Sequence, residues 1–196
     1  MSTSILVAPR EIVDLVYRAS RVTGVDSGVA SMLGRSACFA CGQLGSQLDN
    51  VAEPLASRTS PALGFASVAR AEVEAIRSSA AEIELDTTLT VADLAYSALR
   101  AGERGTSISM KGSDGVLHTP HDWLGAGRAG IVVVALIATT APLDPAVVGR
   151  VKTRHAQALR DGISISSQNW KSVSELARDY LVEESIIDAA ESAPSI

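Results

Sequence analysis

Apolar side chains recur every third or fourth residue in the first third of the chain, which is the spacing of an amphipathic helix. A first helix is predicted from Pro9 to Gly24, with one apolar face: Ile12, Leu15, Val16 and Ala19. A second, capped by Asp26 or Ser27, has a similar face: Val29, Leu33, Ala37, Ala40 and Leu44. Irregular structure is expected over residues 45–65, followed by a third helix at about 67–78.

The middle of the chain changes to the alternating pattern of strands. Ile83 and Leu85 alternate with three acidic residues, Glu82, Glu84 and Asp86, which predicts a half-buried strand. Residues 106–110 and 116–119 flank a turn with two glycines and are predicted to form a hairpin. The apolar run 131–138 predicts the most buried strand, at 130–139.

Helix start signals follow each of these strands. Thr90 and Asp93 have the spacing of a capping box, and the helix that they open is expected to end at Gly102. Asp144 and Pro145 predict a helix that runs to about residue 161, before a short strand at 163–165. Two more helices are predicted, one capped by a serine at position 167 and one from about position 182.

These elements predict an α+β fold, rich in helices, with two helical groups around a small, mostly antiparallel sheet. We expect a single domain over residues 1–196. Its helical N-terminal part would cover about 9–80, and the hairpin, central strand and C-terminal helices about 81–191.

Composition narrows the class of protein. The chain has 196 residues, of which 46% are hydrophobic and 20% charged, so it can build a core and is not a disordered chain. A net charge of −5 argues against a nucleic-acid partner. The longest apolar run is too short to span a membrane, and the start lacks the pattern of a signal peptide. We therefore expect a cytoplasmic protein. Its preference for arginine over lysine, with abundant alanine, is typical of a GC-rich bacterial genome.

Two cysteines form a C-x-x-C pair, Cys38 and Cys41, that invites a metal or redox interpretation. With His118 and His121 they would make a Cys2His2 set, but the spacing does not match that of common zinc sites. Because the cysteines fall within a helical stripe, we expect two buried core residues. We predict no bound metal and no cofactor.

The densest group of chemically useful side chains lies just after the hairpin. His121 is the candidate catalytic base and Asp122 its orienting group, while the candidate ligand-binding residues are Arg35, His118, Trp123 and Arg128. Arg35, on the second helix, would be a further anion clamp. The alternative is a solvated loop that a proline turns and Trp123 anchors to the core.

Two other sequence patterns are better explained by a structural role than by a binding or catalytic site. Residues 125–130 satisfy G-x-G-x-x-G, but a strand follows them where a dinucleotide site needs a helix, so we predict a turn. The segment 149–160 is rich in basic residues, which we expect to lie mostly on a solvated face. Its His155 is expected to be partly buried with its hydrogen bonds satisfied.

In two segments, Glu11 to Ser36 and Trp170 to Ser185, the chain resembles a bacterial family known as domain of unknown function 3726. The first runs from Glu11 to Ser36 and is similar to the family's opening pair of helices with their glycine turn. The second runs from Trp170 to Ser185 and is similar to a late Trp, Leu-Ala and aliphatic-Pro-Glu-Ser stretch, although Glu183 replaces the proline. The family has no established activity, so the resemblance implies no catalytic residue.

We expect a protein that binds a small, anionic metabolite, or an accessory subunit of a metabolic enzyme, without nucleic-acid or membrane partners. Few aromatics in a helix-rich, apolar chain favour a homo-oligomer, a dimer. The alternative is an enzyme that acts on a small carboxylate or phosphate substrate through the loop 118–128. The alternative requires His121, Asp122, Arg128 and Arg35 to converge on one pocket.

Overall fold

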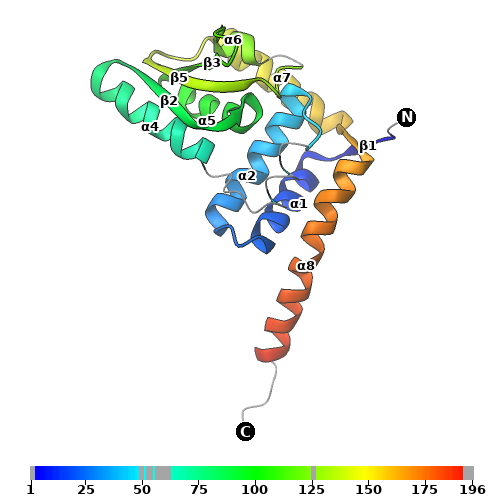
Figure 1. Ribbon diagram of the computed structural model, residues 1–196. Helices are drawn as coiled ribbons and strands as arrows, with labels where there is room; N and C mark the ends of the chain where they lie inside the picture. Colours follow the sequence, from blue (N-terminus) through cyan, green and yellow to red (C-terminus); the bar gives the residue numbers. More distant parts are fainter. Residues whose placement is uncertain (1–2, 49–50, 52–54, 56–62, 125–126, 192–196) are drawn as a thin grey trace.

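A computed structural model describes residues 3–48, 51, 55, 63–124 and 127–191. It has the predicted α+β fold, with one antiparallel sheet of two strands and one of four. The two-stranded sheet pairs β1 (Ser4–Val7) with β6 (Ile163–Ser166), so it joins two segments from opposite ends of the chain. The helix-rich part and the larger sheet lie at different ends of the molecule (Figure 1).

The larger sheet has the strand order β2-β5-β3-β4. Its strands are β2 (Ala80–Thr90), β5 (Val132–Thr140), β3 (Thr106–Gly112) and β4 (Leu117–His118). The expected alternation in β2 is confirmed, because Ile83 is buried and Leu85 half-buried, whereas Glu82, Glu84 and Asp86 are exposed. The predicted buried strand is β5, which pairs with β2 on one side and β3 on the other.

The helices begin close to the predicted positions, except for α6, which forms where a loop was predicted. They are α1 (Pro9–Val22), α2 (Ser27–Phe39), η1 (Ala40–Leu44), α4 (Leu63–Ser78), α5 (Val91–Glu103), α6 (Pro120–Trp123), α7 (Pro145–Asp161) and α8 (Ser167–Glu191). The predicted caps are present, since Asp26 accepts a hydrogen bond from the Gly28 amide and the Thr90 and Asp93 capping box forms. Most of the segment 45–65, where irregular structure was predicted, lies outside the described residues.

Two predicted helix ends are wrong. α5 continues past Gly102, and the residue with a left-handed backbone after it is Gly105, with φ of 96°. The two predicted C-terminal helices are one continuous α8, because residues 178–182 contain no glycine or proline to interrupt it. In Figure 1, α8 runs beside α1 and continues beyond it.

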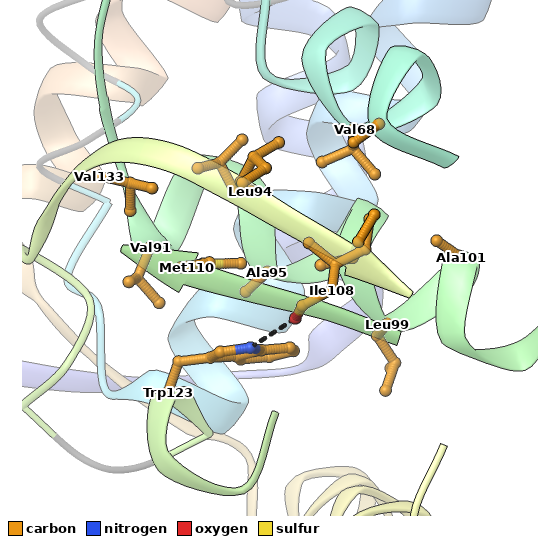
Figure 2. Packing of buried hydrophobic residues seen from close by; sticks show 14 of the residues in the cluster. Val68, Val91, Leu94, Ala95, Leu99, Ala101, Ile108, Met110, Trp123 and Val133 are labelled. Atoms are coloured by element: carbon orange, nitrogen blue, oxygen red, sulfur yellow. Dashed lines mark hydrogen bonds between the residues drawn. The ribbon is translucent and has the colours of Figure 1, made fainter. Parts of the chain in front are cut away.

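Buried apolar side chains form two clusters. The first packs α4 and α5 against the larger sheet, and Figure 2 shows part of it around Trp123. The second joins α1, α2, β6 and the first half of α8. The first half of α8 therefore packs with the N-terminal helices. The boundary expected at about residue 80 does not divide the two clusters, because each cluster contains residues from both sides of it.

One close helix crossing sets the position of the candidate site. A Cβ atom added to Gly34 on α2 would lie 2.5 Å from the backbone oxygen of Val13 on α1, a distance that real Cβ atoms do not adopt. Glycine therefore lets the two helices touch backbone to backbone. The crossing brings Arg35 and Cys38 of α2 beside Arg10 of α1, around a common cavity.

Candidate functional site

The loop predicted to carry chemistry is held by Trp123, whose side chain is fully buried. Its indole Nε1 donates a hydrogen bond to the backbone oxygen of Ile108 on β3 at 3.3 Å, as Figure 2 shows. The ring thus lies in the first apolar cluster among Met110 and Leu99. Trp123 is placed as the anchor of the loop, away from any surface where a ligand would contact it.

The Asp122 carboxylate caps the N-terminus of its own helix, α6. It accepts hydrogen bonds from the Thr119 amide at 3.0 Å and the Thr119 hydroxyl at 2.6 Å, which closes a capping box on α6. The Thr119 hydroxyl, then its amide, holds the pKa of Asp122 below its ordinary value, with a smaller contribution from the nearby histidines. Among the described residues, no hydrogen bond joins Asp122 to His121, whose backbone oxygen accepts from Arg150 at 3.3 Å. The geometry of a base with its orienting group is therefore missing.

His118 and Arg128 lie in different environments, one buried and the other exposed. His118 is buried on β4, and its Nε2 has no hydrogen-bond partner among the described residues. Arg128 is exposed after Gly127, whose φ of 78° fits the turn predicted before β5; Gly125 and the residue after it lie outside the described residues. None of His121, Asp122 and Arg128 lines either of the two cavities that Arg35 lines, so the required convergence is not found there.

Arg35 instead belongs to a cavity between the N-terminal helices and α7, which we call the apolar cavity. It has a volume of about 260 Å³. Its lining is Pro9, Arg10, Val13, Arg35, Cys38, Phe39, Gly42, Gln43, Tyr96, Val151, His155, Ala158 and Ile163. Most of these side chains are aliphatic or aromatic, and the described lining contains no aspartate or glutamate.

The charged groups in the described lining of this cavity are all basic, and two of them have no partner among the residues that the structure describes. Among the described residues, none forms a hydrogen bond or ion pair with the exposed guanidinium groups of Arg10 and Arg35. His155 also lines the cavity and is exposed, so the prediction of a partly buried, satisfied histidine is wrong. Arginine stays protonated at any physiological pH, so the cavity carries fixed positive charge that none of the described residues neutralises.

The wall of the cavity formed by η1 is tied to α7. The Gln43 side chain donates to the Val151 backbone oxygen at 3.2 Å, and Arg154 donates to the Gln43 backbone oxygen at 2.7 Å. Arg154 also donates a hydrogen bond to the Leu124 backbone oxygen at 3.2 Å. Most basic residues of this segment were predicted to lie on a solvated face, but Arg154 is half-buried. The wide π turn of η1 ends at Gly45 with φ of 70°, and such turns frequently mark functional sites.

Cys38 lines this cavity with a thiol, a side chain that can act as a nucleophile. Burial raises the pKa of its thiol from 9.0 to about 11, so the thiolate is scarce at neutral pH. Cys38 and Cys41 are both free thiols, and Cys41 is buried as expected, whereas Cys38 is half-buried at the wall of the cavity. Among the described residues, no three His, Cys, Asp or Glu side chains gather closely enough to hold a metal ion. The thiol is therefore suited to contact a ligand and poorly suited to attack it.

A second hollow lies on the other side of Arg35 and Tyr96, both of which line it too, and we call it the arginine hollow. Its volume is about 390 Å³. Its lining is Gly28, Ser31, Met32, Arg35, Phe65, Val68, Ala69, Tyr96, Ser97, Arg100 and Arg104. The Tyr96 ring packs against Phe39 with 5.9 Å between ring centroids, which fixes the boundary between the two spaces.

Comparison of the chain with family models, curated proteins and solved structures finds no match. None of the described helices is long and apolar enough to cross a membrane. The candidate site therefore stands on its own geometry. Of the predicted site residues, Arg35 alone lines it, and the sequence analysis missed Arg10 and Tyr96, which lie on amphipathic helices with no motif around them.

Proposed function

We propose that this protein binds a small molecule with an apolar body and one anionic group. The apolar cavity takes the body, and Arg10 and Arg35 contact the anion. The observation that carries the proposal is the pair of guanidinium groups that no described residue pairs with, on an apolar cavity whose described lining holds no carboxylate.

The size of the cavity sets the size of the ligand. Its volume of about 260 Å³ falls below the ~300–1,000 Å³ that is typical of sites for drug-sized molecules. A small organic acid fits this space, whereas a dinucleotide does not. Each buried CH₂ group of such an acid contributes roughly 0.8 kcal/mol to binding, so the apolar body supplies affinity while the arginines select the charge.

Binding is favoured over catalysis for two reasons. The Cys38 thiol has a pKa of about 11, which leaves it mostly protonated and a weak nucleophile at neutral pH. The pair His121 and Asp122, which would supply a base, does not line the cavity. A role as a binding protein or as an accessory subunit that carries a metabolite needs neither group.

The experiment is isothermal titration calorimetry with two probes of nearly equal shape, phenylacetate and 2-phenylethanol. We expect phenylacetate to bind at least about ten times more tightly, because a charge-assisted hydrogen bond contributes roughly 1.5–3 kcal/mol. Arg35→Gln should remove this preference. Arg70→Gln is the matched control, since Arg70 is an exposed helical arginine on α4 that lines neither cavity. Equal affinity for the two probes, or equal losses in both variants, would contradict the proposal.

A further inference from the structure

The arginine hollow contains a polar group that the fold leaves unused. Ser97 on α5 lines the hollow and is 7% exposed, and its Oγ has no hydrogen-bond partner among the described residues. A serine inside a helix ordinarily donates to the carbonyl four residues earlier, as Ser20 does to Val16 at 2.7 Å. A buried hydroxyl without a partner is costly, so a ligand atom that accepts from Ser97 would remove a penalty.

The same hollow has an excess of positive charge. Arg104 is held by Glu72, with 2.7 Å between Nε and Oε1, and this pairing raises the pKa of Arg104. Arg100 forms an ion pair with Glu103. Arg35 is the third arginine of the lining and has no partner among the described residues, so three cations face two carboxylates.

The first turns of α2 add one donor on another side. Ser31 lines the hollow close to the N-terminus of α2, whereas the Gly28 amide already donates to the capping Asp26 carboxylate, so the Ser31 hydroxyl is the donor that this side offers to a ligand. Donors therefore surround the hollow from α2, from α5 and from the residue just after α5. A planar carboxylate is satisfied by one arginine fork, whereas a phosphoryl group has three acceptor oxygens that point in different directions. The distribution of donors fits the tetrahedral group.

We infer that the arginine hollow binds the phosphoryl group of a phosphate monoester whose apolar body occupies the apolar cavity. The inference rests on the proposed function, because the two spaces adjoin at Arg35 and Tyr96, which line both of them. Arg35 and Arg100 contact the phosphoryl oxygens, and the Ser97 hydroxyl donates to one of them. The ligand class is thus a small aromatic or aliphatic phosphate ester.

The test is calorimetry on the full chain with phenyl phosphate, phenylacetate and inorganic phosphate. We expect phenyl phosphate to bind about tenfold more tightly than either of the others, as one added charge-assisted hydrogen bond implies. Ser97→Ala should remove most of this advantage and leave phenylacetate binding unchanged. Because the Ser97 hydroxyl has no hydrogen-bond partner in the described part of the chain, the variant should keep or raise the melting temperature. Ser172→Ala, at an exposed position on α8, is the control.

The outcomes separate the two proposals. If phenylacetate binds and phenyl phosphate binds no more tightly, or if Ser97→Ala weakens both probes alike, the phosphoryl site is wrong while the apolar cavity stands. If inorganic phosphate binds as tightly as phenyl phosphate, the two spaces do not share one ligand and the inference is wrong. If neither phenyl compound binds, the proposed function itself fails.

Discussion

The loop of residues 118–128 and the apolar cavity differ in what their polar groups already do. In the loop, the Asp122 carboxylate caps α6 and the Trp123 indole bonds to Ile108, so both groups stabilise the fold. At the cavity, Arg10 and Arg35 have no partner among the described residues. The loop is the richer of the two in chemically useful residue types. The comparison teaches that unused hydrogen-bonding capacity beside an apolar space locates a binding site better than the density of such residues along a chain.

Removal of Trp123 gives the sharpest contrast in stability. Trp123→Ala deletes a fully buried ring and should lower the free energy of unfolding by about 3–5 kcal/mol. Urea unfolding followed by circular dichroism measures this change. If Trp123 contacted a ligand instead, the variant would keep its stability and lose phenylacetate binding, and that result would reverse the roles assigned to the two regions.

The helix crossing beneath the cavity is the next most sensitive point. Gly34→Ala would place a Cβ atom 2.5 Å from the Val13 oxygen and should cost about 1–3 kcal/mol as α1 and α2 separate. Because Arg10 and Arg35 lie on these two helices, phenylacetate affinity should fall as well. Gly149→Ala on α7 is the control, since a Cβ there meets no atom within 4 Å. Equal melting temperatures for the two variants would show that the crossing does not shape the cavity.

Arg154 links η1 to α7 and tests whether the cavity wall is rigid. Arg154→Ala removes hydrogen bonds to the Gln43 and Leu124 backbone oxygens and should cost about 1–2 kcal/mol. Thermal unfolding measures the loss, and Arg160→Ala at an exposed position on the same helix should be neutral. A variant that unfolds normally and binds phenylacetate normally would mean that the wall does not depend on this link.

Asp122 is expected to have the smallest effect. Asp122→Asn should change the free energy of unfolding by no more than about 0.5 kcal/mol, because the residue is exposed, and should leave phenylacetate binding unchanged. Its folded-state pKa lies below the ordinary 3.8, so its contribution is present above pH 4 and disappears as the pH falls below that value. Melting temperatures of the two proteins should therefore converge in acid. A large loss of phenylacetate binding by Asp122→Asn near pH 7 would indicate instead that the loop is part of the binding site.

Much of the fold could be predicted from the sequence because its signals are local. The caps at Asp26, Thr90 and Asp144 and the alternation in β2 depend on residues within a few positions of each other. The pairing of β1 with β6 and the packing of α8 on α1 could not be predicted, since each joins segments from opposite ends of the chain.

The candidate site was harder to predict for the same reason. Arg35 was selected as an anion clamp, but its neighbours in the cavity come from five other elements that no motif connects. His155 was assigned a buried role because Val151 and Leu159 are one helical turn away on each side, yet Leu159 is 63% exposed and that helix face is open. A single sequence shows which helix face is apolar, and it does not show where two such faces leave a gap.

Alkylation of Cys38 in a Cys41→Ala protein tests the central claim most directly, because the thiol lines the apolar cavity. With a pKa of about 11, it should react with iodoacetamide roughly a hundredfold more slowly at pH 8 than a thiol of ordinary pKa. Phenylacetate at saturating concentration should slow the reaction further, and this protection should be lost in Arg35→Gln. A rate that phenylacetate leaves unchanged, in a protein that calorimetry shows to bind it, would place the ligand elsewhere and contradict the account.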